Sequence, residues 1–294
     1  MKSGFVSIVG RPNVGKSTLL NSILERKIAI TSNVSGTTRN IIEGIYNDDD
    51  SQIVFIDTPG IHKPVNKLGN VMNNQAYHMI DEVDIILFLI DASKEFGKGD
   101  TFILDRIKDL DKPIFLVLNK IDLIDKKKLL KIIEECSSLC DFKEIIPISS
   151  LKGDNITDLI NTLKKYLERD ELLYSRDDIT NISRDFYIAE VVREKLLRLT
   201  KDEVPHTITC LVENYEEEEK IINIDVLIIV DRENLKKIII GKNGQMLKKV
   251  GTYARSDIEE FLGKQVNLKT YVKVIESWRE KEKYLRELGF YELK

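Results

Sequence analysis

A glycine-rich loop directly after the first apolar segment constrains how the N-terminal half of this chain can fold. Residues 10–17 read Gly-Arg-Pro-Asn-Val-Gly-Lys-Ser and follow the apolar run of residues 5–9. The two glycines allow backbone N–H groups to turn toward phosphate oxygens, Lys16 can reach the β- and γ-phosphates, and the Ser17 hydroxyl can bind Mg²⁺. A helix that begins near Lys16 adds its positive N-terminal end. The pattern predicts a strand–loop–helix unit that binds a nucleoside triphosphate.

Strand-like and helix-like segments alternate from residue 5 to about residue 167. Apolar runs predict strands at 5–9, 53–56, 85–90, 114–118 and 145–148, and helical patterns lie between them at 17–26, 70–81, 99–110, 126–140 and 156–168. Continuous apolar runs are typical of strands that are buried on both faces of a parallel sheet. We therefore expect an α/β P-loop domain over residues 1–168, with a mostly parallel sheet and helices on both faces.

The pattern changes after a polar segment at residues 169–183, which we expect to be a linker. The order that follows is a helix at 184–199, strands at 207–215 and 221–230, helices at 235–240 and 245–262, and a strand at 266–275. Ser277 and Glu280 have the spacing of a capping box, which predicts a last helix ending at Gly289. The order αββααβ plus a helix predicts a small α+β domain over residues 184–294.

The base of the nucleotide is indicated by Asn119-Lys120-Ile121-Asp122 at the end of the fourth predicted strand. The Asp122 carboxylate can accept hydrogen bonds from N1–H and the N2 amino group of guanine, and adenine has no donor at either place. We expect Asn119 to tie this loop to the phosphate loop and the Lys120 stem to cover the ring. A backbone N–H in the segment Ser149-Ser150-Leu151 can bind guanine O6. The predicted ligand is therefore GTP or GDP.

Two further segments are expected to respond to the γ-phosphate. Asp57-Thr58-Pro59-Gly60 closes the second predicted strand, where Asp57 can face Mg²⁺ through water and the Gly60 N–H can contact the γ-phosphate. In the loop before that strand, we choose Thr38 as the ligand that binds Mg²⁺ only with GTP, and Thr37 is the alternative. The predicted metal ligands are Ser17, Thr38 and Asp57.

The residue that orients the attacking water stays open. Ras-like GTPases carry a glutamine after D-x-x-G, and this chain has Ile61, so we expect slow intrinsic hydrolysis. His62 can in principle orient water, although a loop histidine with no such role fits the position as well. Asn13 can hold K⁺ against the phosphates, in place of an arginine finger. The candidate catalytic residues are Lys16, Thr38, Gly60 and Asn13.

Together the motifs define a predicted nucleotide site. Its residues are Gly10, Arg11, Pro12, Asn13, Val14, Gly15, Lys16, Ser17, Asp57, Thr58, Pro59, Gly60, Ile61, Asn119, Lys120, Ile121, Asp122, Ser149, Ser150 and Leu151. The rest of the composition adds little chemistry. Three cysteines and three histidines lack metal-site spacing, and no apolar run is long enough to span a membrane, so we expect a cytoplasmic protein.

A basic region lies within a chain whose formal net charge is −4. Residues 232–273 contain ten lysines and arginines against four acidic residues, and the turn Gly241-Lys242-Asn243-Gly244 joins two predicted helices there. A glycine-rich turn of this kind lets a nucleic-acid backbone approach closely. We expect single-stranded RNA to bind at Ile240, Gly241, Lys242, Asn243, Gly244 and Lys248. Trp278 is expected to be a core anchor rather than a stacking residue.

The series G-R-P-N-V-G-K-S, T-T-R, D-T-P-G, N-K-I-D and S-S-L-K-G resembles the TrmE–Era–EngA group of bacterial translational GTPases. In the C-terminal half, I-I-G-K-N-G on the αββααβ pattern is similar to a type II KH domain. One GTPase domain followed by one KH domain resembles the Era family. The single phosphate loop disfavours an EngA-like protein, and the N-terminal position of the GTPase domain disfavours a TrmE-like one.

This resemblance implies binding of the single-stranded 3′ end of 16S rRNA through the KH domain in the GTP-bound state, and a role in 30S subunit assembly. It also implies a monomer, partly located at the inner face of the cell membrane. Two other classes stay open. Ile61 favours a nucleotide-gated RNA-binding module that barely hydrolyses GTP. A membrane-surface GTPase is disfavoured because lysines and arginines in the last helix are offset by glutamates.

Overall fold

The computed structural model describes residues 1–291, and contacts divide the chain into two compact units. The first unit comprises Met1–Ala29, Thr38–Pro64 and Asn70–Asn181, and the second comprises Ile30–Thr37, Val65–Gly69 and the chain from Ile182 onward. The second predicted domain runs to residue 294, so its last three residues lie outside the described ones. Within residues 1–291, no helix combines the length and apolar character needed to cross a bilayer.

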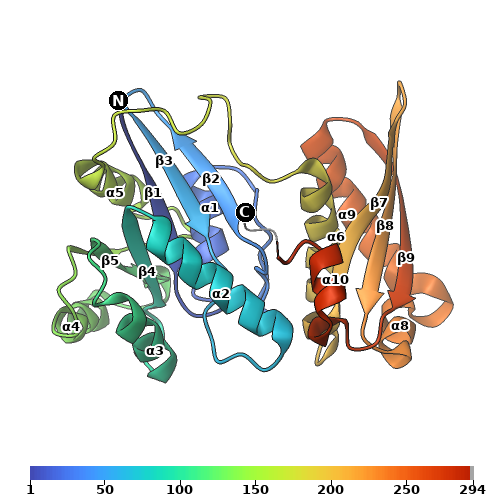
Figure 1. Cartoon of the computed structure of the whole chain (residues 1–294), viewed down its shortest axis with the longest axis horizontal. Helices are drawn as coiled ribbons and strands as arrows, with labels where there is room; N and C mark the ends of the chain where they lie inside the picture. Colours follow the sequence, from blue (N-terminus) through green and yellow to red (C-terminus); the bar gives the residue numbers. More distant parts are fainter. Residues whose placement is uncertain (292–294) are drawn as a thin grey trace. The chain divides into compact units, whose positions relative to one another are not determined.

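A six-stranded sheet forms the centre of the first unit (Figure 1). Its strands are β1 (Lys2–Val9), β2 (Ile42–Asn47), β3 (Ser51–Asp57), β4 (Ile85–Asp91), β5 (Ile114–Asn119) and β6 (Glu144–Pro147), in the spatial order β2-β3-β1-β4-β5-β6. All neighbouring strands are parallel except β2, which pairs antiparallel with β3. The predicted α/β fold with a mostly parallel sheet is confirmed.

Helices cover both faces of this sheet. They are α1 (Lys16–Ile23), α2 (Lys67–Glu82), α3 (Lys98–Ile107), α4 (Lys126–Ser137) and α5 (Ile156–Leu163). Apolar residues of α2, α3 and α4 pack with β4 and β5 side chains in one core cluster. On the opposite face, Gly44 of β2 lies so close to α1 that an added Cβ would stand 2.6 Å from the Leu20 side chain. The close contact explains why a glycine interrupts the apolar pattern of this edge strand, which the sequence analysis missed.

Residues 169–181, the first part of the predicted linker, lie along the first unit. The Gln52 side chain accepts hydrogen bonds from the backbone N–H groups of Leu173 (2.7 Å) and Tyr174 (2.9 Å). Arg169 forms an ion pair with Asp84 at 3.0 Å, and the Thr180 hydroxyl donates to the Glu43 carbonyl at 2.6 Å. This segment is therefore anchored to the sheet edge by its own polar groups.

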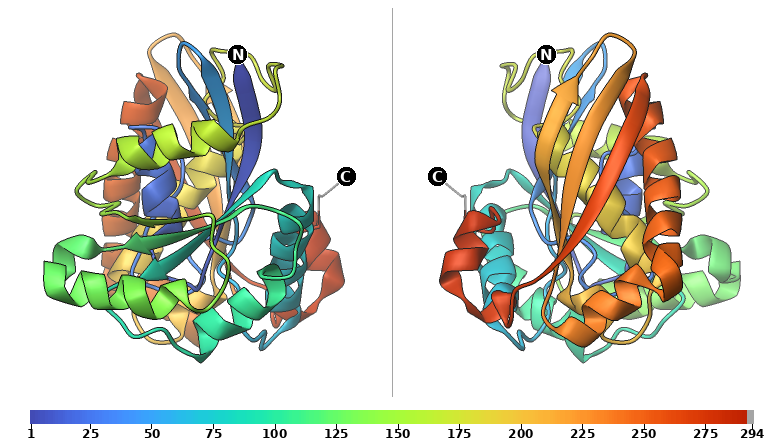
Figure 2. Two further views of the ribbon diagram at one scale, coloured as in Figure 1. Left: turned by 90° about the vertical axis from the view of Figure 1, so that its left-hand side faces the viewer. Right: turned by 90° about the vertical axis from the view of Figure 1, so that its right-hand side faces the viewer.

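The second unit contains a three-stranded sheet of β7 (Thr209–Glu217), β8 (Ile221–Val230) and β9 (Gln265–Val274), seen at the right of Figure 2. β7 and β8 form an antiparallel hairpin, and β8 and β9 are parallel. The helices are α6 (Arg184–Leu199), α7 (Val204–Thr207), α8 (Glu233–Ile240), α9 (Gln245–Leu262) and α10 (Glu282–Glu287). Buried residues of α6, α8 and α9 pack on β8 in one core. The predicted αββααβ order is confirmed, with the short α7 added.

The chain after β9 differs from its prediction. Ser277 adopts a left-handed conformation (φ 52°), and its side chain caps no N–H group of the described residues, so the capping box is wrong. A 3₁₀ turn at Trp278–Glu280 precedes α10 instead. Trp278 is fully buried and its Nε1–H donates to the Thr207 carbonyl at 2.8 Å, which confirms it as a core anchor.

Candidate nucleotide site and nucleic-acid interface

Glycines shape the phosphate loop because neighbouring segments approach it closely. Gly15 has φ 108°, and a Cβ there would lie 2.2 Å from Nδ2 of Asn119. A Cβ at Gly10 would lie 2.4 Å from the Leu89 carbonyl oxygen. Gly60 packs against Pro12 in the same way, with a Cβ 2.8 Å from the proline ring. Only glycine fits these places, so the loop, the end of β4 and the D-T-P-G segment can lie against one another.

Lys16 spans the loop to which it belongs. Its Nζ donates to the carbonyl oxygens of Gly10 and Arg11, both at 3.2 Å, and the side chain is buried. Burial lowers the pKa of Lys16 to about 8, and the nearby Asp57 carboxylate opposes that shift. A buried ammonium group gains strongly from an anion, so phosphate oxygens at this loop would favour its charged form.

The three predicted metal ligands meet at one point. The Ser17 hydroxyl donates to Asp57 Oδ2 at 2.6 Å and lies 2.8 Å from the Thr38 hydroxyl, which donates to the same carboxylate oxygen at 3.4 Å. Burial raises the pKa of Asp57 to about 6, against the effects of Lys16, Ser17 and Thr38. Asp57 Oδ1 is buried and accepts no hydrogen bond from the described residues. Two hydroxyls and a carboxylate with a free oxygen fit Mg²⁺, which prefers oxygen ligands.

The structure distinguishes the two candidate threonines. The Thr37 hydroxyl donates to the Val34 carbonyl at 2.7 Å and lies 2.6 Å from the Ser32 hydroxyl, both within the second unit. Thr38 alone of the two contacts Ser17 and Asp57 among the hydrogen bonds of the described residues. The geometry therefore favours Thr38 as the threonine that binds Mg²⁺ only with GTP.

The predicted guanine-binding segments are fixed by their own hydrogen bonds. Asn119 Nδ2 donates to the Val14 carbonyl at 2.8 Å, and Asn119 Oδ1 accepts from the N–H and hydroxyl of Ser150, both at 2.9 Å. Lys120 donates to the Asn13 carbonyl at 2.8 Å and pairs with Asp91 at 2.7 Å. These contacts join the N-K-I-D loop, the S-S-L segment and the phosphate loop.

The Asp122 carboxylate is held by a hydrogen bond, but the residue remains exposed to solvent. The Ser149 hydroxyl donates to its Oδ1 at 2.6 Å, and the residue is exposed. Ile121 N–H donates to the Ile148 carbonyl at 3.2 Å, which ties the same loop to the end of the sheet. Leu151, at 75% exposure, projects from the neighbouring segment. A planar base with two N–H donors on one edge fits this arrangement.

Other residues singled out in the sequence lie in the same part of the first unit. Arg11 pairs with Asp100 of α3 at 2.7 Å, so its guanidinium is committed to that helix. The Thr58 hydroxyl is buried and donates to the Ile8 carbonyl at 3.0 Å, beside Pro59. Ile61 is 2% exposed and belongs to the core cluster under α2 and α3. His62 Nδ1 lies 3.0 Å from the Lys63 carbonyl oxygen. Asn13 stands exposed at φ 65° at the tip of the phosphate loop.

A groove of about 350 Å³ lies between α9 and β9 in the second unit. It begins at Gly244, the last residue of the predicted turn, and continues along one face of α9 past Lys248 to Arg255. The turn needs left-handed backbone at Gly241 (φ 71°), Asn243 (φ 50°) and Gly244 (φ 74°), while Lys242 is exposed and Ile240 half-buried at the end of α8. A basic, glycine-edged groove of this kind suits a single nucleic-acid strand.

Most of the groove lining was missed in the sequence analysis. Beyond Gly244 and Lys248, the lining consists of Leu247, Gly251, Thr252, Arg255, Val266, Asn267, Leu268 and Thr270. A signal was available, because positions 244, 248, 251, 252 and 255 recur at the helical period on one face of α9. Gly251 forms an open floor, since an added Cβ would meet no heavy atom of the described residues within 4 Å.

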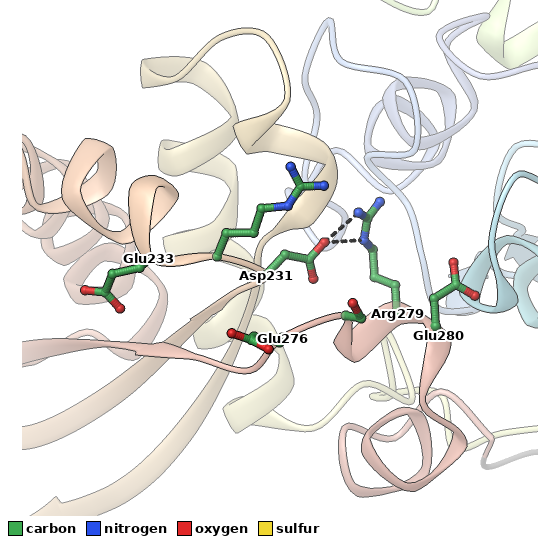
Figure 3. A pocket seen from close by; sticks show the side chains of 7 residues that line it. Asp231, Glu233, Glu276, Arg279 and Glu280 are labelled. Carbon is green, nitrogen blue, oxygen red and sulfur yellow. Dashed lines mark hydrogen bonds and ion pairs between the residues drawn. The ribbon is translucent and has the colours of Figure 1, made fainter.

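A second pocket, of about 410 Å³, is unsuited to a phosphate chain (Figure 3). Four of its seven lining residues are acidic: Asp231, Glu233, Glu276 and Glu280. Of its two arginines, Arg279 pairs with Asp231 at 2.6 Å, as the dashed lines in Figure 3 mark. Like charge would repel the backbone of RNA here. The α9–β9 groove is therefore the better nucleic-acid interface.

Comparison with known proteins agrees with this geometry. A family model described as 50S ribosome-binding GTPase matches residues 5–120, and one described as KH domain matches residues 203–279. A crystal structure of Era in complex with MgGDPNP and nucleotides 1506–1542 of 16S ribosomal RNA is 44% identical, with 99% of each chain covered and a TM-score of 0.96. Aquifex aeolicus Era, as a variant bound to GDP·AlF4⁻, is 43% identical, with the same coverage and a TM-score of 0.95.

These similarities extend over both units. The two family models fall on the first and second halves of the chain, and the Era structures align with 99% of it. The P-loop, D-T-P-G and N-K-I-D segments occupy the first unit, and the glycine-edged groove occupies the second. The chain belongs to the Era family of GTPases, in which a GTPase domain precedes an RNA-binding KH domain.

Proposed function

We propose that this protein is a GTP-operated switch in small ribosomal subunit assembly. In the GTP-bound state it binds the single-stranded 3′ end of 16S rRNA through its KH domain, and hydrolysis resets it. The observation that carries this proposal is the basic groove that begins at Gly244 in a chain that also holds a complete set of GTP motifs. The related Era crystal structure contains a GTP analogue and 16S rRNA nucleotides together.

In this proposal the residues of the first unit have separate roles in binding and hydrolysing GTP. Ser17, Thr38 and Asp57 hold Mg²⁺, which supplies charge neutralisation on the β- and γ-phosphate oxygens when bound. Lys16 adds a second positive charge at the same oxygens, and the Gly60 N–H senses the γ-phosphate. Asp122 reads guanine, and Ser149, which donates to it at 2.6 Å, fixes the carboxylate in place.

Slow intrinsic hydrolysis follows from the position of Ile61. Its side chain is buried and apolar, so it offers no hydrogen bond to an attacking water. We propose that K⁺ near Asn13 neutralises part of the transition-state charge. Single-turnover hydrolysis measured in K⁺ and in Na⁺ buffers tests this point. Equal rates in the two salts would rule out the K⁺ role and leave the GTPase assignment intact.

Domain limits at residues 1–168 and 184–294, a monomeric state and peripheral membrane contact are also part of the proposal. The membrane contact rests on the family resemblance. Flotation with anionic liposomes, compared with neutral ones, decides it without affecting the RNA assignment.

The experiment for the main proposal measures single-turnover GTP hydrolysis and subunit binding together. RNA of the 16S 3′ end should bind the GTP-analogue form and change the hydrolysis rate, whereas a scrambled RNA should not. Co-sedimentation should place the protein with 30S subunits. Association with 50S subunits only, as the name of the matching GTPase family suggests for its members, would contradict the 30S role.

A further inference from the structure

Residues 30–37, which directly precede Thr38, are built into the second unit. Ile30 is 1% exposed and packs in the core formed by α6, α8, α9 and the three-stranded sheet, and Val34 is partly buried against the same core. The segment also carries its own hydrogen bonds, between Thr37, Ser32 and the Val34 carbonyl. The segment of residues 30–37 that contacts α6 is therefore held by its own hydrogen bonds.

Charged side chains of α6 hold this segment at both ends. Glu194 Oε1 accepts the Thr31 N–H at 3.0 Å, and Arg198 donates to the Thr31 carbonyl at 3.1 Å and to its hydroxyl at 3.3 Å. At the other end, Arg193 Nη2 donates to the Thr37 carbonyl. Backbone groups are hydrogen-bond partners at both ends, so the contacts fix the course of the chain.

Two of these charged side chains are almost completely buried. Arg193 is 1% exposed and Glu194 is 0% exposed. Arg193 pairs with Glu190 at 2.5 Å, and Glu194 pairs with Lys195 at 3.0 Å and with Arg198 at 2.9 Å. Buried ion pairs add little net stability compared with apolar residues of similar size. We therefore assign these ion pairs a role in fixing the positions of residues 31 and 37 rather than in stabilising the fold.

The same cluster reaches the helix that lines the RNA groove. Lys195 pairs with Asp257 of α9 at 2.5 Å. The groove residues Lys248, Thr252 and Arg255 lie on α9 within three turns of Asp257. Within the second unit, a continuous set of ion pairs and hydrogen bonds thus runs from residues 31–37 through α6 to α9.

We propose that Arg193 and Glu194 are positioning residues that couple the nucleotide to RNA binding. Consecutive Cα atoms are about 3.8 Å apart, so a Thr37 held by Arg193 restricts where Thr38 can place its hydroxyl. When Mg²⁺ and the γ-phosphate also hold Thr38, both constraints act on one peptide and each favours the other. Loss of the γ-phosphate removes one constraint and weakens the docking of residues 30–37 on α6. This inference rests on the proposed nucleotide-gated RNA binding.

The test is the ratio of RNA dissociation constants for the GDP and GTP-analogue forms. Coupling of this kind typically amounts to about 5- to 150-fold. In Arg193→Met the ratio should fall toward one. Arg198→Met, at an exposed position that also contacts Thr31, should lower it partially. Arg184→Met is the matched control, because Arg184 also lies on α6 but pairs with Asp185 and stacks on Tyr215. Its ratio should equal that of the wild type.

A reciprocal measurement separates coupling from simple structural damage. Thermodynamic linkage requires RNA to raise the affinity for the GTP analogue, relative to the affinity for GDP, by the same factor. Arg193→Met should lose that factor, while its GDP affinity in the absence of RNA is unchanged. If Arg193→Met does not fold, two other variants decide. Arg193→Lys keeps the positive charge at the buried position, and Arg198→Met changes an exposed position. If RNA binding by the wild type depends on the nucleotide and every variant keeps the wild-type ratio, this inference alone is overturned. A wild-type ratio of one overturns the proposed gating and this inference together.

Discussion

Replacing Asp57 by asparagine should stabilise the metal-free protein at neutral pH. The Asp57 carboxyl is fully buried, and burial raises its pKa to about 6 despite the opposing effects of Lys16, Ser17 and Thr38. In the unfolded chain an aspartate has a pKa of about 3.9. Above pH 6 the folded protein therefore holds an ionised carboxylate under conditions less favourable than those of the unfolded chain.

The magnitude follows from the difference between the two pKa values. Because the folded state binds the proton more tightly, the contribution of Asp57 to the free energy of unfolding falls as pH rises from about 4 to about 6 and is level above that range. A shift of about two pKa units corresponds to about 3 kcal/mol. Asp57→Asn cannot ionise and avoids this loss. Its amide oxygen can still accept the hydrogen bond that the Ser17 hydroxyl now donates at 2.6 Å.

Denaturant unfolding followed by circular dichroism, from pH 4 to pH 8 with EDTA and no nucleotide, measures the effect. We expect the Asp57→Asn variant and the wild type to have equal stability near pH 4 and to differ by about 3 kcal/mol at pH 7.5. Asp177→Asn, at an exposed loop position, is the control and should match the wild type throughout. A constant difference at all pH values, or a wild type that gains stability relative to the variant between pH 4 and 6, would refute the argument.

Three other substitutions test the two binding sites. Asp122→Asn should lower GTP affinity by about 10³-fold or more and favour xanthine nucleotides, because an amide donates where the carboxylate accepts; retained guanine preference in competition binding would exclude Asp122 as the base reader. Gly251→Ala should raise the free energy of unfolding by about 0.5–1 kcal/mol, since alanine is the better helix former, yet weaken RNA binding because the methyl group enters the open groove floor; unchanged RNA affinity would place the strand elsewhere. Lys248→Ala should weaken RNA binding and reduce the magnitude of the slope of log K against log salt concentration by about one. Lys283→Ala, on α10 and outside the groove, should leave this slope unchanged.

The parts of the fold that depend on local pattern were predictable from the sequence. Continuous apolar runs identified the parallel strands, and the P-loop and N-K-I-D motifs placed the nucleotide segments at strand ends. The edge strand β2 was missed because Gly44 breaks its pattern, and the need for that glycine lies in its close contact with Leu20 of α1. A tertiary contact of this kind leaves no local signal.

The same reason explains what was missed at the two sites. The groove floor at Gly251 has no motif of its own. The helical spacing of residues 244, 248, 251, 252 and 255 marks one face of α9, but that this face lines a groove is recognised only when α9 and β9 lie together. The choice between Thr37 and Thr38 required the hydroxyl contacts to Ser17 and Val34, and adjacent threonines look alike in sequence. The association of residues 30–37 with α6 joins positions more than 150 residues apart, through the buried Arg193.

The central claim is that bound GTP controls RNA binding, and RNA affinity in the two nucleotide states tests it most directly. A short RNA of the 16S 3′ end and a scrambled RNA would be titrated at one fixed salt concentration with protein loaded with GDP or with a non-hydrolysable GTP analogue. The account predicts tighter, sequence-selective binding in the GTP-analogue state. Equal affinity in both states would leave a GTPase domain and an RNA-binding domain on one chain and would contradict control of one by the other.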